Sequence, residues 1–132
     1  MGRTILSEDG RFEWDEDKSR RNRKKHGFSF DEILEIFDDP AFLEGYNWEH
    51  SGKEDRYYGI GCLNNILYII VFYTYRKKNN MDGIMEGREK GYSVHDSGPP
   101  PYIFERVRII SARRTDNDEQ EEYHGYFKKI KS

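Results

Sequence analysis

The feature that most restricts the fold is the longest predominantly apolar run in the chain, Ile66–Tyr75. Successive side chains of a strand point to opposite faces of the sheet, and 66–72 are all apolar or aromatic. Such a run buries both faces and is typical of the middle of a sheet. It is too short for a membrane-spanning helix, which needs about 20 apolar residues. We therefore predict a central strand over 66–76.

The neighbouring strands are predicted from a turn and from alternation. Asn64-Asn65 suit a two-residue hairpin turn, which predicts an antiparallel partner strand over 56–63. A third strand is predicted over 106–112, where two sets of residues alternate between the faces. One set is Val107, Ile109 and Ser111, and the other is Arg108, Ile110 and Ala112. Shorter strands are expected over 5–6, 11–14 and 42–46.

Two helices are expected in the N-terminal part of the chain. Asp15 is a suitable N-cap and Gly27 a suitable residue after the last turn, which predicts a helix over 15–26. Its least charged stripe consists of Ser19, Asn22 and His26. Ser29 and Glu32 have the spacing of a capping box, and apolar residues follow at helical spacing. This second helix is expected to end at Asp38-Asp39-Pro40.

The segment 77–105 interrupts the pattern of strands. It has no sustained period and contains several glycines and the run Pro99-Pro100-Pro101. Loops of this length are uncommon in compact domains and are usually functional or disordered. We predict a long loop insertion within a hairpin. Beyond the third strand, aromatic residues near helical spacing predict a short C-terminal helix within 117–131.

Together these elements predict one α+β domain over residues 1–132. Two N-terminal helices would pack on a small, mainly antiparallel sheet, with the short C-terminal helix after it. Charged residues make up 36% of the chain, but the aromatic content of 15% supplies enough bulk for a core.

Charge, cysteine and histidine content narrow the function. The net charge is −3, but positive residues are concentrated in 18–25 and 106–114, so a nucleic-acid partner is not excluded. One cysteine excludes a disulfide scaffold and a cysteine zinc site. His50, His95 and His124 lack metal-ligand spacing, so we expect no metal and no cofactor. The N-terminus lacks the layout of a signal peptide, so we expect a cytoplasmic protein without a membrane partner.

Five motifs in order resemble one family. They are Phe12-Glu13-Trp14-Asp15, Lys25-His26-Gly27, Ser29-Phe30, Phe37-Asp38-Asp39-Pro40 and Arg108-Ile109-Ile110-Ser111-Ala112-Arg113-Arg114. This pattern resembles the BrnT family, the ribonuclease toxins of type II toxin–antitoxin systems, over about 11–76 and 106–123. The resemblance implies a RelE-like fold, cleavage of RNA, a block of translation and growth, and neutralisation by a BrnA-type antitoxin. It leaves open whether the RNA is cleaved on the ribosome.

The candidate catalytic residues are those that metal-free RNA cleavage needs. The attacking 2′-hydroxyl needs a base, the phosphorane needs cations, and the leaving oxygen needs an acid. Arginine matches phosphate oxygens, and histidine titrates near neutral pH. The catalytic candidates are Lys25, His26, Arg76, Arg108 and Arg113. The candidate substrate-binding residues are Trp14, Arg56 and Arg114.

Each candidate also has a structural interpretation. Trp14 packs in the core or stacks on a base, and His26 ends a helix or transfers protons. Arg113 binds phosphate or pairs with Asp116 or Glu119. Hairpin pairing places Arg76 near Arg108 and away from Arg113, so one phosphate bound by all three arginines conflicts with the expected register.

A second function remains open from the sequence. The family often has Thr-Glu-Arg at the end of the central strand, where this chain has Thr74-Tyr75-Arg76. The missing carboxylate and the 77–105 insertion suggest a catalytically silent RNA- or protein-binding module of the same fold. In a further alternative, the insertion itself is the binding element of an interaction protein.

Overall fold

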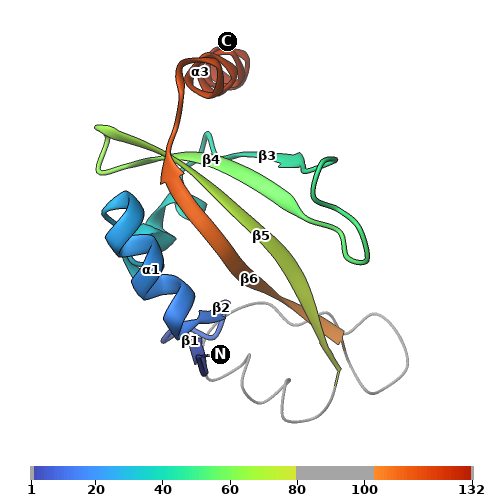
Figure 1. Cartoon of the computed structure of the whole chain (residues 1–132). Coiled ribbons are helices and arrows are strands. Elements are labelled where there is room, and N and C mark those ends of the chain that lie inside the picture. The colour runs from blue at the N-terminus through green and yellow to red at the C-terminus, as the bar shows by residue number, and fades with distance from the viewer. Residues whose placement is uncertain (1, 80–102, 132) are drawn as a thin grey trace.

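The computed structural model describes residues 2–79 and 103–131 as an α+β fold built on one six-stranded sheet (Figure 1). The strand order is β1-β2-β6-β5-β4-β3. The strands are β1 (Thr4–Leu6), β2 (Phe12–Asp15), β3 (Leu43–Tyr46), β4 (Tyr57–Leu63), β5 (Leu67–Asn79) and β6 (Ile103–Arg114). The helices are α1 (Glu16–His26), the 3-10 helix η1 (Asp31–Asp38) and α3 (Asn117–Lys131).

The predicted central strand is confirmed, because β5 lies between β6 and β4. Asn64 and Asn65 have φ angles of 54° and 64° and form the predicted turn between β4 and β5. The pairing of β5 with β6 continues to Asn79 opposite Ile103, so both strands extend into the predicted insertion. The rest of that insertion, 80–102, lies outside the described residues.

The sheet is mainly antiparallel, as predicted, but one pair of strands is parallel. β2 pairs with β6 in parallel, with Glu13 opposite Arg108, so the sheet is mixed. The other four pairings are antiparallel. Parallel neighbours need a long connection, and here most of the chain runs between β2 and β6. Turn residues predict local hairpins and carry no information about this distant pairing.

The predicted alternation along β6 is also wrong, because β6 contains a β-bulge. Phe72 lies opposite Ser111, but Tyr73 lies opposite Ile109, so Ile110 is an extra residue. An extra residue shifts the alternation by one position. Ile109 and Ala112 therefore point to the same face, where they are 2% and 1% exposed.

The first face of the sheet is the one to which Ile69, Val71 and Tyr73 of β5 point, and it carries the main core. Both α1 and η1 cover this face (Figure 1). α1 has the predicted ends, because Asp15 accepts a hydrogen bond from the Lys18 N–H and Gly27 has a φ of 90°. The predicted stripe is confirmed at Ser19 and Asn22, which are buried.

The second helical segment forms where predicted, but it is a 3-10 helix. In a 3-10 helix, residues three apart lie above one another. Phe30, Ile33 and Ile36 have this spacing, and all three are fully buried. Of the predicted capping box, the Glu32 carboxylate accepts from the Ser29 N–H at 2.9 Å. The Ser29 hydroxyl donates to carboxylates and does not cap a backbone amide.

The second face of the sheet is the opposite one, and α3 packs on part of it through Tyr123 and Phe127. This confirms the predicted C-terminal helix. Two tyrosine hydroxyls fasten it: Tyr123 donates to Asp39 at 2.7 Å, and Tyr58 of β4 donates to Glu122 at 2.6 Å.

The attachment of α3 is expected to make stability sensitive to alkaline pH. Burial and the hydrogen bond to Glu122 raise the pKa of Tyr58 to about 12, whereas an unfolded tyrosine has a pKa of about 10. Because the folded pKa is the higher one, this stabilisation is complete below about pH 10 and is lost as the pH rises toward 12. Urea unfolding at pH 9 and at pH 11 should show a smaller loss in Tyr58→Phe than in wild type. An equal loss in both would contradict this role, and Tyr126→Phe on α3 is the control.

Candidate functional site

Three arginines lie together on the second face of the sheet, away from the residues that contact α3. Arg76 of β5 lies directly opposite Arg106 of β6, and Arg108 lies opposite Thr74. Directly opposed residues have Cβ atoms about 5 Å apart, and diagonal neighbours are within reach of long side chains. We call Arg76, Arg106 and Arg108 the arginine cluster.

A buried glutamate of β2 anchors two members of the cluster. Glu13 accepts a hydrogen bond from Arg108 Nη1 at 2.5 Å, and its other oxygen is 3.6 Å from Arg106 Nη1. Arg106 Nε also donates to the Gly10 carbonyl at 2.9 Å. The side chains of Glu13 and Arg106 are 7% and 6% exposed, whereas that of Arg108 is 24% exposed. The parallel pairing of β2 with β6 therefore places Glu13 beside Arg108 and fixes the position of the Arg108 side chain.

The third arginine is more accessible and has a weaker partner. Arg76 Nη1 is 3.2 Å from the Glu54 carboxylate, and the Arg76 side chain is 44% exposed. The other Glu54 oxygen is 3.7 Å from Arg56 Nε. Exposed ion pairs contribute about 0–1 kcal/mol, so a stronger anionic ligand can displace this contact. Arg56 lies just before β4, and in the described contacts it shares Glu54 with Arg76.

The cluster has the chemistry of a phosphate-binding surface. Guanidinium groups bind phosphate oxygens through two parallel hydrogen bonds, and partial burial strengthens such contacts. Arg108 is fixed by Glu13, so it loses little side-chain entropy when a ligand binds. Glu54 places a carboxylate, a possible proton acceptor, beside the accessible Arg76.

The structure does not bring Arg113 to this cluster. Arg113 lies opposite Ile70, six residues along β5 from Arg76, which corresponds to about 20 Å at 3.3 Å per residue. Both Arg113 Nη atoms donate to Glu119 of α3 at 2.8 Å, which is the predicted ion-pair alternative. The hydrogen bond to Glu119 raises the pKa of the Arg113 guanidinium. The neighbouring Arg114 is exposed, and its guanidinium carbon lies 5.9 Å from the centre of the Phe28 ring.

Lys25 and His26 are also distant from the cluster. They end α1, which covers the first face, whereas the cluster is on the second. Asn22, one helical turn before His26, bonds to Ala112 of β6, so His26 lies toward the Arg114 end of that strand. Lys25 is exposed and His26 is half-buried. Lys25 and His26 therefore lie on the other face and at the opposite end of the sheet from the arginine cluster.

Trp14 is placed in the core. Its side chain is 5% exposed and packs on the first face with Phe12 and Ile109. Of the two roles predicted for Trp14, the structure supports packing in the core.

Sequence analysis missed three residues of this site. Arg106 has the same parity as Arg108 along β6, and this signal was available in the sequence. Glu13 looked like an ordinary polar residue of an alternating strand, and only the β2–β6 pairing makes it a buried partner. Glu54 is in the loop before β4, and no sequence pattern links it to Arg76.

The described part of the chain, residues 2–79 and 103–131, contains neither a metal-binding group of side chains nor a membrane-spanning helix. In this part of the chain, no group of three or more histidine, cysteine or acidic side chains is placed to hold a metal ion. No helix of this part has both the length and the hydropathy to cross a membrane.

The fold and the arginine cluster define a class: a small α+β protein whose sheet presents guanidinium groups suited to phosphate. The model of one family, described as "Ribonuclease toxin, BrnT, of type II toxin-antitoxin system", matches residues 14–84. The chain therefore belongs to the BrnT family of ribonuclease toxins. Membership implies an RNA substrate and an antitoxin partner. No match was found among curated proteins.

The matched region divides the candidate residues. Lys25, His26, Arg56 and Arg76 lie inside it, and the arginines of β6 lie beyond its end. Arg106 and Arg108 enter the site through their pairing with Arg76 and through Glu13. The three-dimensional contacts therefore add residues that the family match does not reach.

Proposed function

We propose that this chain is the toxin of a type II toxin–antitoxin pair and that it cleaves RNA at the arginine cluster without a metal ion. The observation that carries the proposal is this cluster in a BrnT-family chain, with the Arg76 side chain 44% and the Arg108 side chain 24% exposed. Arg76 and Arg108 would bind the scissile phosphate. Arg106 and Glu13 would hold Arg108 in position.

In the proposed reaction the 2′-hydroxyl attacks the adjacent phosphorus, and the bond to the 5′-oxygen breaks. Glu54, beside Arg76, takes the 2′-hydroxyl proton, and the arginines stabilise the negative charge that develops on the phosphorane. The leaving 5′-oxygen takes a proton from water and Glu54 returns its proton to solvent, so the products are a 2′,3′-cyclic phosphate and a 5′-hydroxyl end. Glu54 thus supplies a carboxylate at the strand end where Tyr75 stands in place of the family's glutamate.

The candidates at the far end of the sheet have a supporting role in this proposal. Arg113 lies about 20 Å from Arg76 along the strands, too far to share its phosphate. A longer RNA can reach beyond the arginine cluster, so Lys25, His26, Arg113 and Arg114 would bind flanking phosphates. The RelE-like architecture, the cytoplasmic location and a BrnA-type antitoxin complete the proposal.

The test is RNA cleavage by Arg76→Ala and Arg108→Ala. Removal of one group that stabilises the charge of a transition state costs about 10²–10³ in rate, and we expect losses of this size. The assay follows a short labelled RNA and identifies the cyclic phosphate end. Arg3→Ala, which removes an exposed positive charge that is paired only with the half-buried Glu16 in the described contacts, is the control and should cleave normally.

Arg113→Ala separates the two ends of the sheet. Under this proposal it weakens RNA binding and leaves the cleavage rate at saturating RNA within about tenfold of wild type. Loss of cleavage in Arg113→Ala with full activity in Arg76→Ala would move the active site to the other end. RNA binding without cleavage in the wild type would identify the silent binding module. Salt-dependent binding accompanies RNA contact in either case.

A further inference from the structure

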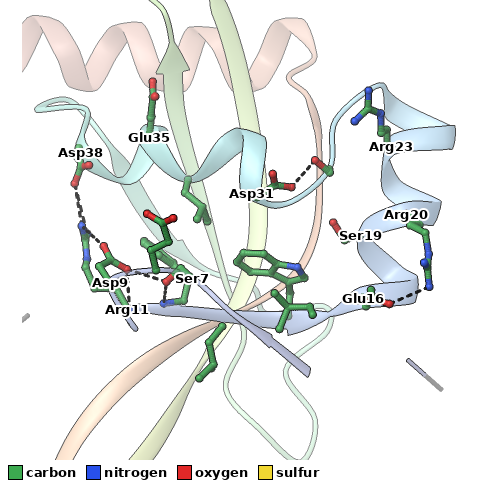
Figure 2. Close-up of a pocket in the computed structure, with 17 residues that line it drawn as sticks. Ser7, Asp9, Arg11, Glu16, Ser19, Arg20, Arg23, Asp31, Glu35 and Asp38 are labelled. Carbon is green, nitrogen blue, oxygen red and sulfur yellow. Dashed lines mark hydrogen bonds and ion pairs between the residues drawn. The ribbon is translucent and has the colours of Figure 1, made fainter. Parts of the chain in front are cut away.

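A groove lies at the N-terminal edge of the sheet, apart from the arginine cluster. It encloses a cavity of about 870 Å³ between β1 and β2 on one side and α1 and η1 on the other (Figure 2). Pockets that bind ligands have volumes of about 300–1,000 Å³. No step of the proposed cleavage uses it.

The floor of the groove is apolar. Phe12 and Trp14 of β2 form its base with the half-buried Ile5 and Leu34. Leu6 of β1 borders the groove, but it lies opposite Glu13 in the sheet, so its side chain points to the second face. An apolar floor with two half-buried aliphatic side chains favours contact with an apolar ligand group.

The rim of the groove is acidic. Six of its lining residues carry a carboxylate and three carry a guanidinium. Each of the three guanidinium groups already has an acidic partner: Arg11 pairs with Asp38 at 3.4 Å, Arg20 with Asp17 at 2.6 Å and Arg23 with Glu32 at 3.6 Å. Figure 2 shows Asp9, Arg11 and Asp38 together at one end of the groove. A ligand with positive charge fits this rim, and RNA does not.

The groove also borders an open edge of the sheet. β1 is the last strand in the sheet order and pairs only with β2 among the described strands. The outer backbone groups of such a strand are available to an added extended chain. This edge favours a polypeptide over a small molecule.

We propose that this groove docks an extended protein segment that places apolar side chains on the floor and lysine or arginine side chains at the acidic rim. Within the toxin–antitoxin pair proposed above, the segment belongs to the antitoxin, and only this attribution rests on the proposed function. β2 forms the groove floor with Trp14 and holds the arginine cluster with Glu13, which points to the other face. A segment in the groove therefore contacts the strand that supports the site.

The test measures binding of a short labelled peptide of alternating leucine and lysine by fluorescence anisotropy. Two matched peptides, one of alternating serine and lysine and one of alternating leucine and glutamate, should bind much more weakly. Two variants should reduce leucine–lysine binding by about tenfold or more. Leu34→Asp places a charge in the floor, and the double variant Glu8→Lys/Asp38→Lys reverses two charges at the rim. Both positions of the double variant are exposed, and the Asp38 side chain is 69% exposed.

The double variant Glu49→Lys/Glu121→Lys makes the same charge change at exposed positions outside the groove and should bind normally. Thermal unfolding of every variant confirms that each is folded. Equal binding by the groove and control variants would overturn the proposal, as would equal binding of the serine–lysine peptide. Displacement of the peptide by a short RNA would assign the groove to RNA. Self-association of the wild type that Leu34→Asp abolishes would assign it to a second copy.

The binding test does not depend on catalysis. Failure of the cleavage assay with groove-dependent peptide binding would remove the proposed function and leave the docking site. Cleavage that depends on Arg76, together with peptide binding that the groove variants do not change, would support the proposed function and remove the docking site.

Discussion

Replacement of Glu13 with alanine is expected to destabilise the protein by about 3–5 kcal/mol, because it removes a buried carboxylate that faces two guanidinium groups. Glu13 is 5% exposed, and its two oxygens face Arg108 at 2.5 Å and Arg106 at 3.6 Å. Arg106, also 5% exposed, cannot turn into solvent without opening the junction of β2 and β6. Urea unfolding at neutral pH measures the loss.

Glu54→Ala is the matched control for this prediction. Glu54 also contacts two arginines, Arg56 and Arg76, but its side chain is 36% exposed. Water replaces its contacts, so the expected cost is at most about 1 kcal/mol. A loss of stability in Glu13→Ala as small as that in Glu54→Ala would show that the contacts of Glu13 with Arg106 and Arg108 do not hold β2 against β6. Conditions that keep Glu13→Ala folded should still show reduced RNA cleavage, because Arg108 loses its anchor.

Replacement of Asn22 with alanine is expected to cost about 2–5 kcal/mol. The Asn22 amide donates to the Phe28 carbonyl at 2.9 Å and accepts from the Ala112 N–H at 3.1 Å. Alanine leaves both backbone groups without these partners, and each buried unsatisfied group costs about 1–3 kcal/mol. The gain in helix propensity is only a few tenths of a kcal/mol and does not offset this.

Two measurements check the Asn22 prediction. Urea unfolding gives the overall loss, and hydrogen exchange of the Ala112 amide should accelerate in Asn22→Ala. Arg21→Ala changes the adjacent, exposed position of the same helix and should leave stability within about 0.5 kcal/mol of wild type. Unchanged exchange at Ala112 in Asn22→Ala would contradict the proposed bond between α1 and β6.

Local features of the fold could be predicted because each depends on residues close together in sequence. The turn at Asn64-Asn65, the N-cap Asp15 and the C-terminal Gly27 all act within a few residues and were confirmed. The apolar run of β5 identified the central strand because burial on both faces leaves no room for polar residues. The buried stripe of α1 could be predicted because Ser19 and Asn22 are uncharged positions in a highly charged helix.

The second helical segment shows where local patterns stop being decisive. The spacing of its apolar residues suits one face of an α-helix, and three of them also fit the three-residue turn of a 3-10 helix. Packing selects the latter, because Phe30, Ile33 and Ile36 are all fully buried against the sheet. The sequence established that a helical segment lies here, and tertiary contacts decided its type.

The composition of the site depended on tertiary structure for a related reason. Motif order identified the BrnT family and the arginine-rich strand from the sequence alone. The bulge at Ile110 and the parallel pairing of β2 with β6 decided which arginines share a face. A bulge is one residue without a partner, and a parallel pair joins strands that are distant in the chain. Neither leaves a periodic signal, so Glu13 and Arg106 entered the site only when the strands were paired.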